Sequence, residues 1–95
     1  MQATFELIHN HRERLVFEAV LAKAAAMDLL GDGELVADIA CLALNRVRPR
    51  YIRHEVDMAF YQTYAERQGV ESEIADAVEY AVRFVVDRRS QGEAA

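Results

Sequence analysis

The chain has 95 residues, of which 53% are hydrophobic, and its 11 Lys and Arg residues against 16 Asp and Glu residues give a formal net charge of −5. This length suits one domain with a single packed core, and charged residues interrupt every long apolar stretch, so we expect a cytoplasmic protein without a membrane span or secretion signal. The acidic total argues against broad binding of duplex DNA, and a single cysteine excludes an internal disulfide and a thiolate zinc cluster.

The composition favours helices over strands. Only four glycines and one proline occur, and the remaining composition suits helices. We therefore predict a mainly α-helical fold, a small bundle of four to five helices with at most one short extended segment near residues 50–54. Residues 1–89 form the single domain in this interpretation, and residues 90–95 form a frayed C-terminal tail.

A long first helix is predicted to begin at His11, after a short apolar stretch. Asn10 and Glu13 have the spacing of a capping box, in which Asn accepts from a helical N–H group and Glu reaches back. The helix should end at the turn Gly31-Asp32-Gly33, whose second or third residue can cap the next helix. Its apolar stripe, which can face the core or a second copy of the chain, comprises Leu15, Val16, Ala19, Val20, Ala22, Ala26, Met27, Leu29 and Leu30.

The second predicted helix, from about Glu34 to Arg46, is apolar on nearly every side and should be the central element of the bundle. Asp38 and Asn45 share one face with Cys41 between them, so a polar seam follows an otherwise buried helix. In one interpretation Asn45 caps the helix end and Asp38 holds a neighbouring backbone or arginine group; in the other, Asp38 accepts hydrogen bonds from a ligand. Cys41 is expected to be a small buried residue.

A short extended segment is predicted at residues 50–53, because Pro49 forces the residue before it out of helical geometry. Such a strand is too short to be stable alone, so it should pair with a copy of itself or pack on helices. In an extended segment Tyr51 and Arg53 point to the same side. Tyr51 then either stacks on a ligand or serves as a core aromatic residue beside the proline.

Two further helices complete the predicted fold. One spans about Val56 to Arg67, and Gly69 is expected to break or kink it. The last spans about Val70 to Arg89, with an acidic first half and a basic second half that complement the helix dipole. The acidic residues of that first half are Glu71, Glu73, Asp76 and Glu79. The apolar stripes of the first and last helices together predict a homodimer at micromolar concentration.

Arginine dominates the basic residues and is concentrated in one place. Ten of the eleven basic residues are arginine, and four of those ten lie in the eight residues from Arg46 to Arg53. Arginine favours planar, bidentate recognition of phosphate or guanine, whereas lysine offers a compact point charge. The cluster indicates a local anion site on an acidic protein; the alternative is a chance grouping on the surface.

Two sequence blocks carry a family resemblance: IHNHRERLVFEAVL at 8–21 and ADIACLALNRVRPRYIRHE at 37–55. The first fits the approximate motif N-x-x-E-x-x-V-x-E, and the second fits D-I-x-A-L-A-L-N-x-L-P-P-x-Y. On these motifs the chain resembles the late competence development protein ComFB family, a set of small bacterial helical proteins. The matching residues are Asn10, Glu13, Val16, Glu18, Asp38, Ile39, Leu42, Ala43, Leu44, Asn45, Pro49 and Tyr51.

The departures from the family pattern also matter. Members often carry a cysteine cluster consistent with zinc just before the second block, but the stretch MDLLGDGELVA has none, so no metal site is predicted. Arg48 stands where the family has its first proline, which adds a guanidinium where phosphate contacts are expected. The resemblance implies a homodimer and, for some relatives, binding of cyclic di-GMP. We therefore predict a non-enzymatic regulatory protein that relays binding of this second messenger to a protein partner.

A ligand with two phosphates and two guanines needs cations, donors for guanine O6 and N7, an acceptor for the N1/N2 edge and a flat stacking partner. Residues 46–57, together with Asp38 on the second predicted helix, include side chains that can serve each of these purposes. The predicted ligand-binding residues are Arg46, Arg48, Arg50, Tyr51, Arg53 and Asp38, with Glu55 and Asp57 as further candidate acceptors. Asn10, Glu13, Asn45 and Pro49 are assigned to the structural motif.

Other functions fit the residues less well. His9 and His11 lie two apart on the expected helix and lack a third ligand, and His54 accompanies no nucleophile motif or phosphate loop, so no metal, cofactor or catalytic residue is predicted. The main alternative is a competence-associated interaction or DNA-binding protein without a nucleotide ligand. DNA binding predicts steep salt dependence and affinity that grows with oligonucleotide length, whereas a nucleotide pocket predicts saturable binding of one small molecule. A plain interaction dimer predicts neither behaviour.

Overall fold

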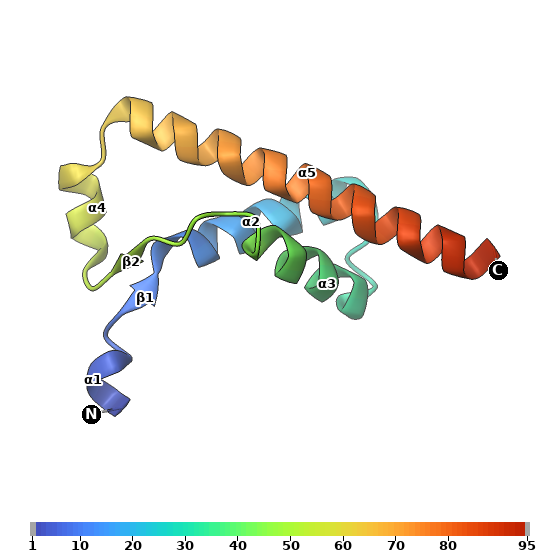
Figure 1. Ribbon diagram of the computed structural model, residues 1–95, viewed down its shortest axis with the longest axis horizontal. Coiled ribbons are helices and arrows are strands. Elements are labelled where there is room, and N and C mark those ends of the chain that lie inside the picture. Colours follow the sequence, from blue (N-terminus) through green and yellow to red (C-terminus); the bar gives the residue numbers. More distant parts are fainter. Residues whose placement is uncertain (1, 95) are drawn as a thin grey trace.

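The structure, a computed structural model, describes residues 2–94 and is mainly α-helical, as predicted (Figure 1). None of the helices within that range has the length and hydropathy that a bilayer-spanning segment needs. In chain order the elements are α1 (Gln2–Phe5), β1 (His9–Asn10), α2 (His11–Ala26), α3 (Gly33–Leu44), β2 (Tyr51–Ile52), α4 (Glu55–Tyr61) and α5 (Tyr64–Ala94).

Helices α2, α3 and α5 form the hydrophobic core by packing against one another. Their buried side chains recur at intervals of three and four residues, because such positions lie on one face of a helix. Parts of the stripes predicted on the first and last helices are therefore buried inside a single chain. The core residues are Val16, Val20 and Ala24 of α2, Leu35, Ile39 and Ala43 of α3, and Val70, Ile74, Ala77, Val78, Ala81 and Val82 of α5.

Helix α2 begins at His11, as predicted, because Asn10 caps it. The Oδ1 atom of Asn10 accepts a hydrogen bond from the backbone N–H of Arg12 at 3.1 Å. Glu13, the expected second arm of the capping box, is exposed to solvent. The start of this helix thus depends on the asparagine side chain, which satisfies one of the N–H groups that the first turn leaves without a partner.

Helix α2 ends at Ala26, before the glycine-containing turn at which the sequence predicted its end. The backbone of Asp28 adopts a left-handed conformation, with φ 58°, which aspartate tolerates better than most residues. The N–H of Asp28 donates to the carbonyl of Ala25 at 3.2 Å, and the N–H of Leu29 donates to that of Ala24 at 2.8 Å. An aspartate therefore forms the Schellman cap that glycine usually forms.

Asp32 connects the start of α3 to the C-terminal part of α5. Its Oδ1 atom accepts from the N–H of Leu35 at 3.1 Å, so Asp32 caps α3, and its Oδ2 atom pairs with Arg89. The hydrogen bond from Arg89 and that from Leu35 both favour the charged carboxylate, and they lower the pKa of Asp32 below its ordinary value. The ionised form of Asp32 is thus the one that stabilises the fold.

Two substitutions of Asp32 separate its cap from its charge. We expect D32A to lower the melting temperature at neutral pH more than D32N does, because asparagine keeps the cap and loses only the charged pair with Arg89. Since the folded-state pKa lies below the unfolded-state value, the charge stabilises above the unfolded-state pKa, and this contribution is lost as the pH falls through the folded-state pKa. In circular dichroism melts, the difference between wild type and D32N should therefore be larger at about pH 7 than at about pH 2.5. An equal difference at both pH values contradicts this role for the charge.

The polar seam predicted on the second helix is exposed rather than buried. Asp38, Cys41 and Asn45 all lie at the solvent-exposed side of α3, beside the buried stripe that contains Ile39. The prediction that Cys41 is a buried residue is therefore wrong. The helix contacts both α2 and α5, as expected of a central element. Within residues 2–94 its main helix contacts are with these two, and the side that carries Asp38 and Cys41 is exposed.

The predicted extended segment forms β2, but its partner was not the one expected. It pairs antiparallel with β1 of the same chain, with His9 opposite Ile52 and Asn10 opposite Tyr51. This pairing corrects the expectation that the segment pairs with a copy of itself, whereas the alternative that it packs on helices agrees with its contacts to α4. A two-residue strand becomes stable in this position because residues at the start of α2 also bind the backbone of Arg50.

The predicted helix over residues 56–67 is divided into two elements, and the break lies at Gln62 and Thr63 rather than at Gly69. Thr63 and Glu66 form a capping box: Thr63 Oγ1 accepts from the N–H of Glu66 at 3.1 Å, and Glu66 Oε2 accepts from the N–H of Thr63 at 3.3 Å. Glycine inside a helix costs only about 1 kcal/mol relative to alanine, so α5 continues through Gly69.

Helix α5 spans the molecule and continues as a helix through residues 90–94, where a frayed tail was expected (Figure 1). At the other end of the chain, α1 projects away from the three-helix core. The radius of gyration is 15.5 Å, above the ~12–13 Å that a compact chain of this length would have. The single chain is therefore elongated, and its ends extend beyond the core.

Candidate functional site

The arginine segment, residues 46–53, connects α3 to α4, and Asn10 fixes the middle of it. The Oδ1 atom that caps α2 also accepts from the backbone N–H of Arg50 at 2.8 Å. Beside it, the backbone N–H of His11 donates to the carbonyl of Arg50 at 2.7 Å. One asparagine side chain thus sets both the start of the helix and the position of the segment, and the sequence had indicated only the first of these roles.

A second anchor comes from α5 and involves two residues that sequence reasoning missed. The Oε1 atom of Glu73 accepts from the backbone N–H of Arg48 at 2.9 Å. The Nη1 atom of Arg12 donates to the carbonyl of Arg48 at 3.2 Å and lies 3.5 Å from Oε2 of Glu73. From the sequence, Glu73 was assigned only to the acidic first half of the last helix, which complements the helix dipole. No local pattern connects it to Arg48, 25 positions earlier in the chain.

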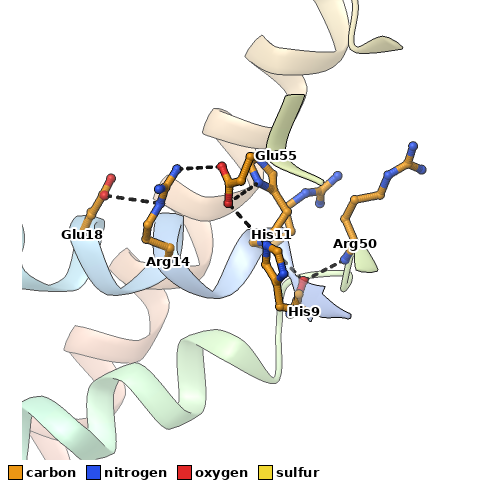
Figure 2. A network of polar contacts seen from close by, with 8 residues as sticks. His9, His11, Arg14, Glu18, Arg50 and Glu55 are labelled. Carbon is orange, nitrogen blue, oxygen red and sulfur yellow. Dashed lines mark hydrogen bonds and ion pairs between the residues drawn. The ribbon is translucent and has the colours of Figure 1, made fainter. Parts of the chain in front are cut away.

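A network around Glu55 joins β1 and α2 to the start of α4 (Figure 2). Its Oε1 atom lies 3.4 Å from His9 Nε2 and 4.0 Å from His11 Nδ1, and its Oε2 atom lies 3.4 Å from Arg14 Nη2. Arg14 also pairs with Glu18 one turn along α2. The carboxylate of Glu55 is therefore engaged in this network, which argues against its predicted role as a ligand acceptor.

Three arginines of the segment keep their guanidinium groups available. Arg48, Arg50 and Arg53 are exposed, and within residues 2–94 no acidic side chain pairs with their guanidinium groups. Figure 2 shows the side chain of Arg50 extending away from the Glu55 network. Tyr51 lies among them with 66% of its surface exposed, whereas the next residue, Ile52, is half-buried. The alternation predicted for an extended segment is present, and Tyr51 is not a core residue.

Arg50 and Arg12 line a groove of about 390 Å³ that is otherwise formed by α4, the residue after it and the first part of α5. The floor is partly apolar, with Met58 and Val70, and Glu73 brings a carboxylate that is already used by the second anchor. Glu66, which belongs to the capping box with Thr63, also lines the groove, so two arginines and two carboxylates meet there. Among residues 2–94, no group of three His, Cys, Asp or Glu side chains is placed to hold a metal ion.

Arg46 and Asp38 lie apart from this groove. The guanidinium carbon of Arg46 is 3.8 Å from the centre of the Tyr80 ring on α5, and Asp38 lines a different groove, between α3 and α5. Asn45, the C-cap residue of α3, donates from Nδ2 to the carbonyl of Cys41 at 3.0 Å, which confirms its predicted cap. The six predicted ligand-binding residues are thus divided between two places.

Residues 2–94 define a small, mainly α-helical protein in which a three-helix core supports an exposed arginine segment. The sequence matches the family described as "Late competence development protein ComFB" over residues 9–89. The chain therefore belongs to the ComFB family. The description of this family relates the chain to late competence development. No curated protein and no solved structure matches the chain. The family match extends through α4 and most of α5, well beyond the motifs recognised in the sequence.

Proposed function

We propose that this chain is a non-enzymatic regulatory protein that binds cyclic di-GMP in the cytoplasm and relays this binding to a protein partner. One observation carries the proposal: on an acidic protein, the guanidinium groups of Arg48, Arg50 and Arg53 are exposed and without acidic partners within residues 2–94, beside an exposed Tyr51. Unpaired arginines on a rigid segment favour an anionic ligand, because little side-chain pairing must be broken when it binds.

The segment offers chemistry that matches this ligand. Arginine binds phosphate and the O6 and N7 atoms of guanine with two parallel hydrogen bonds, and an exposed tyrosine can stack on a base. The hydrogen bonds from Asn10, His11 and Glu73 hold the backbone of the segment in place before the ligand arrives. Such preorganisation lowers the entropy that binding must overcome.

A thermal-shift experiment tests the proposed function against DNA binding. At a cyclic di-GMP concentration about 100 times the dissociation constant, binding should stabilise the fold by about 2.7 kcal/mol and raise the melting temperature by roughly 10–20 °C. Duplex oligonucleotides of increasing length serve as the comparison. Stabilisation that grows with oligonucleotide length and disappears at high salt, with none from cyclic di-GMP, would replace the proposal with a DNA-binding function.

We further propose that the protein acts as a homodimer. Large apolar side chains remain exposed at the N-terminal end of the chain, on α4 and at the start of α5, and an elongated single chain with such surface is typical of a subunit that associates. Association with a second copy would cover this surface symmetrically. The exposed side chains are Phe5, Leu7, Ile8, Val56, Phe60 and Tyr64.

Light scattering at micromolar concentration tests the dimer, and we expect twice the mass of one chain. Replacing Leu7 and Ile8 by serine should shift the equilibrium toward the monomer, because about half of each side chain is exposed and would be available to an intermolecular contact. Leu30→Ser is the matched control, since Leu30 is equally exposed but lies in the turn between α2 and α3. A monomeric mass for the wild-type protein contradicts the proposal.

A further inference from the structure

A second groove of about 480 Å³ lies between α3 and α5. Its volume is in the range of small-molecule sites. The groove combines an apolar floor with an acid, a thiol, an amide, an aromatic ring and two arginines. The lining residues are Leu35, Asp38, Cys41, Leu42, Asn45, Phe84, Val85, Arg88 and Arg89.

Two aromatic rings on α5 offer flat surfaces at and beside this groove. Tyr80 and Phe84 are 41% and 42% exposed, and their rings are nearly parallel, at 21°, with centres 6.0 Å apart. The guanidinium carbon of Arg46 lies 3.8 Å from the centre of the Tyr80 ring, so this face of Tyr80 is already occupied. Arg88 lies 5.7 Å from the centre of the Phe84 ring, which is wider than a closed stack. A planar base between the Phe84 ring and the Arg88 guanidinium would make two stacked contacts of about 3.5 Å each, so the ring and the guanidinium would have to lie about 7 Å apart. A small movement of Arg88 away from Phe84 provides this separation.

The acid of the groove matches the edge of guanine. Asp38 is exposed, and within residues 2–94 its carboxylate has neither a hydrogen bond nor an ion pair. The interpretation that it holds a neighbouring backbone or arginine group therefore finds no support among these residues. Guanine presents two adjacent donors, N1–H and N2–H, to which both oxygens of a carboxylate can bind. Adenine presents an acceptor at N1 and would face the carboxylate with repulsion.

We infer that the groove between α3 and α5 binds a guanine base, with the ring stacked on Phe84 beneath Arg88 and its N1/N2 edge on the carboxylate of Asp38. The inference deepens the proposed function and rests on it for the identity of the full ligand. Asn45 lines the groove, and the arginine segment begins at the next residue of the sequence.

Cys41 reports on this groove directly, because it is the single cysteine of the chain, is exposed and lines the groove. We would measure its rate of modification by a maleimide with cyclic di-GMP, GMP or AMP present. Saturating GMP or cyclic di-GMP should slow the reaction at least about fivefold, and AMP should not. In D38N this protection should be lost and the affinity for cyclic di-GMP should fall about tenfold or more, the scale of one bidentate base contact. The matched control, Glu34→Gln, neutralises an exposed acid of α3 outside the groove and should behave as wild type.

The outcomes separate the two proposals. Suppose that cyclic di-GMP binds, that Cys41 stays reactive in its presence and that D38N binds it as tightly as wild type. The base then lies elsewhere, which overturns the inferred guanine site and leaves the proposed function standing. If cyclic di-GMP does not bind, the proposed function fails, and GMP then tests the groove by itself. Protection of Cys41 by GMP and not by AMP supports the groove in that case, and no protection by either nucleotide overturns it.

Discussion

Replacing Arg50 or Arg53 with alanine should strongly weaken binding of cyclic di-GMP and leave the helical content unchanged. Both guanidinium groups are exposed and unpaired with acids in the part of the chain that the structure describes, so their removal breaks no contact of the fold. A hydrogen bond to a charged group contributes about 1.5–3 kcal/mol, so each lost contact should weaken binding by about 10- to 150-fold. Calorimetry measures the affinity, and far-ultraviolet circular dichroism measures the helicity.

Arg83→Ala is the control for this experiment. Arg83 is also an exposed arginine, but it lies on α5 and pairs with Glu79 one turn away. Its loss changes the net charge by the same amount and removes no residue of the arginine segment. Equal affinities of wild type, R50A and R53A would place the ligand away from this segment, whereas equal losses in all three arginine variants would indicate a nonspecific effect of charge.

Replacing Ile39 with alanine should destabilise the fold more than the loss of the Asp32 cap does. Ile39 is completely buried in α3, where it packs between α2 and α5. Truncating a buried isoleucine to alanine costs about 2–5 kcal/mol, from lost burial and from the cavity left behind. For a domain of this size the melting temperature should fall by about 10 °C or more.

Thermal and urea unfolding at one fixed protein concentration measure this loss, because the stability of a dimer depends on concentration. Ala37→Gly on the exposed side of α3 is the control, and it should cost only about 1 kcal/mol, the propensity difference between the two residues. A similar loss of stability in both variants would mean that α3 does not sit at the centre of the core.

Local signals in the sequence determined most of the fold. The caps at Asn10 and Asp32 lie within three residues of the groups they satisfy, so the starts of α2 and α3 could be predicted. The capping box of Thr63 and Glu66 is equally local, but the sequence-based prediction did not include it and placed the break at Gly69. By contrast, the end of α2 was placed too late because an aspartate took the left-handed position that usually signals glycine.

The candidate site depends more on contacts between distant residues. The arginine cluster was visible in the sequence because its members are neighbours. Nothing local indicated that Asn10 would bind the backbone of Arg50, or that Glu73 would bind that of Arg48. The separation of Arg46 from the other arginines likewise depends on Tyr80, which lies 34 positions further along the chain and reaches it through the packing of α3 on α5.

Isothermal titration of the purified protein with cyclic di-GMP, with cyclic di-AMP and GTP as controls, tests the proposed nucleotide binding most directly. We predict saturable binding of cyclic di-GMP and none of comparable affinity for cyclic di-AMP, since the arginine segment and Asp38 both suit guanine. Titrations without binding heat for all three nucleotides, repeated at a second temperature to exclude a coincidental zero enthalpy, would contradict this function and leave a helical interaction protein of the ComFB family.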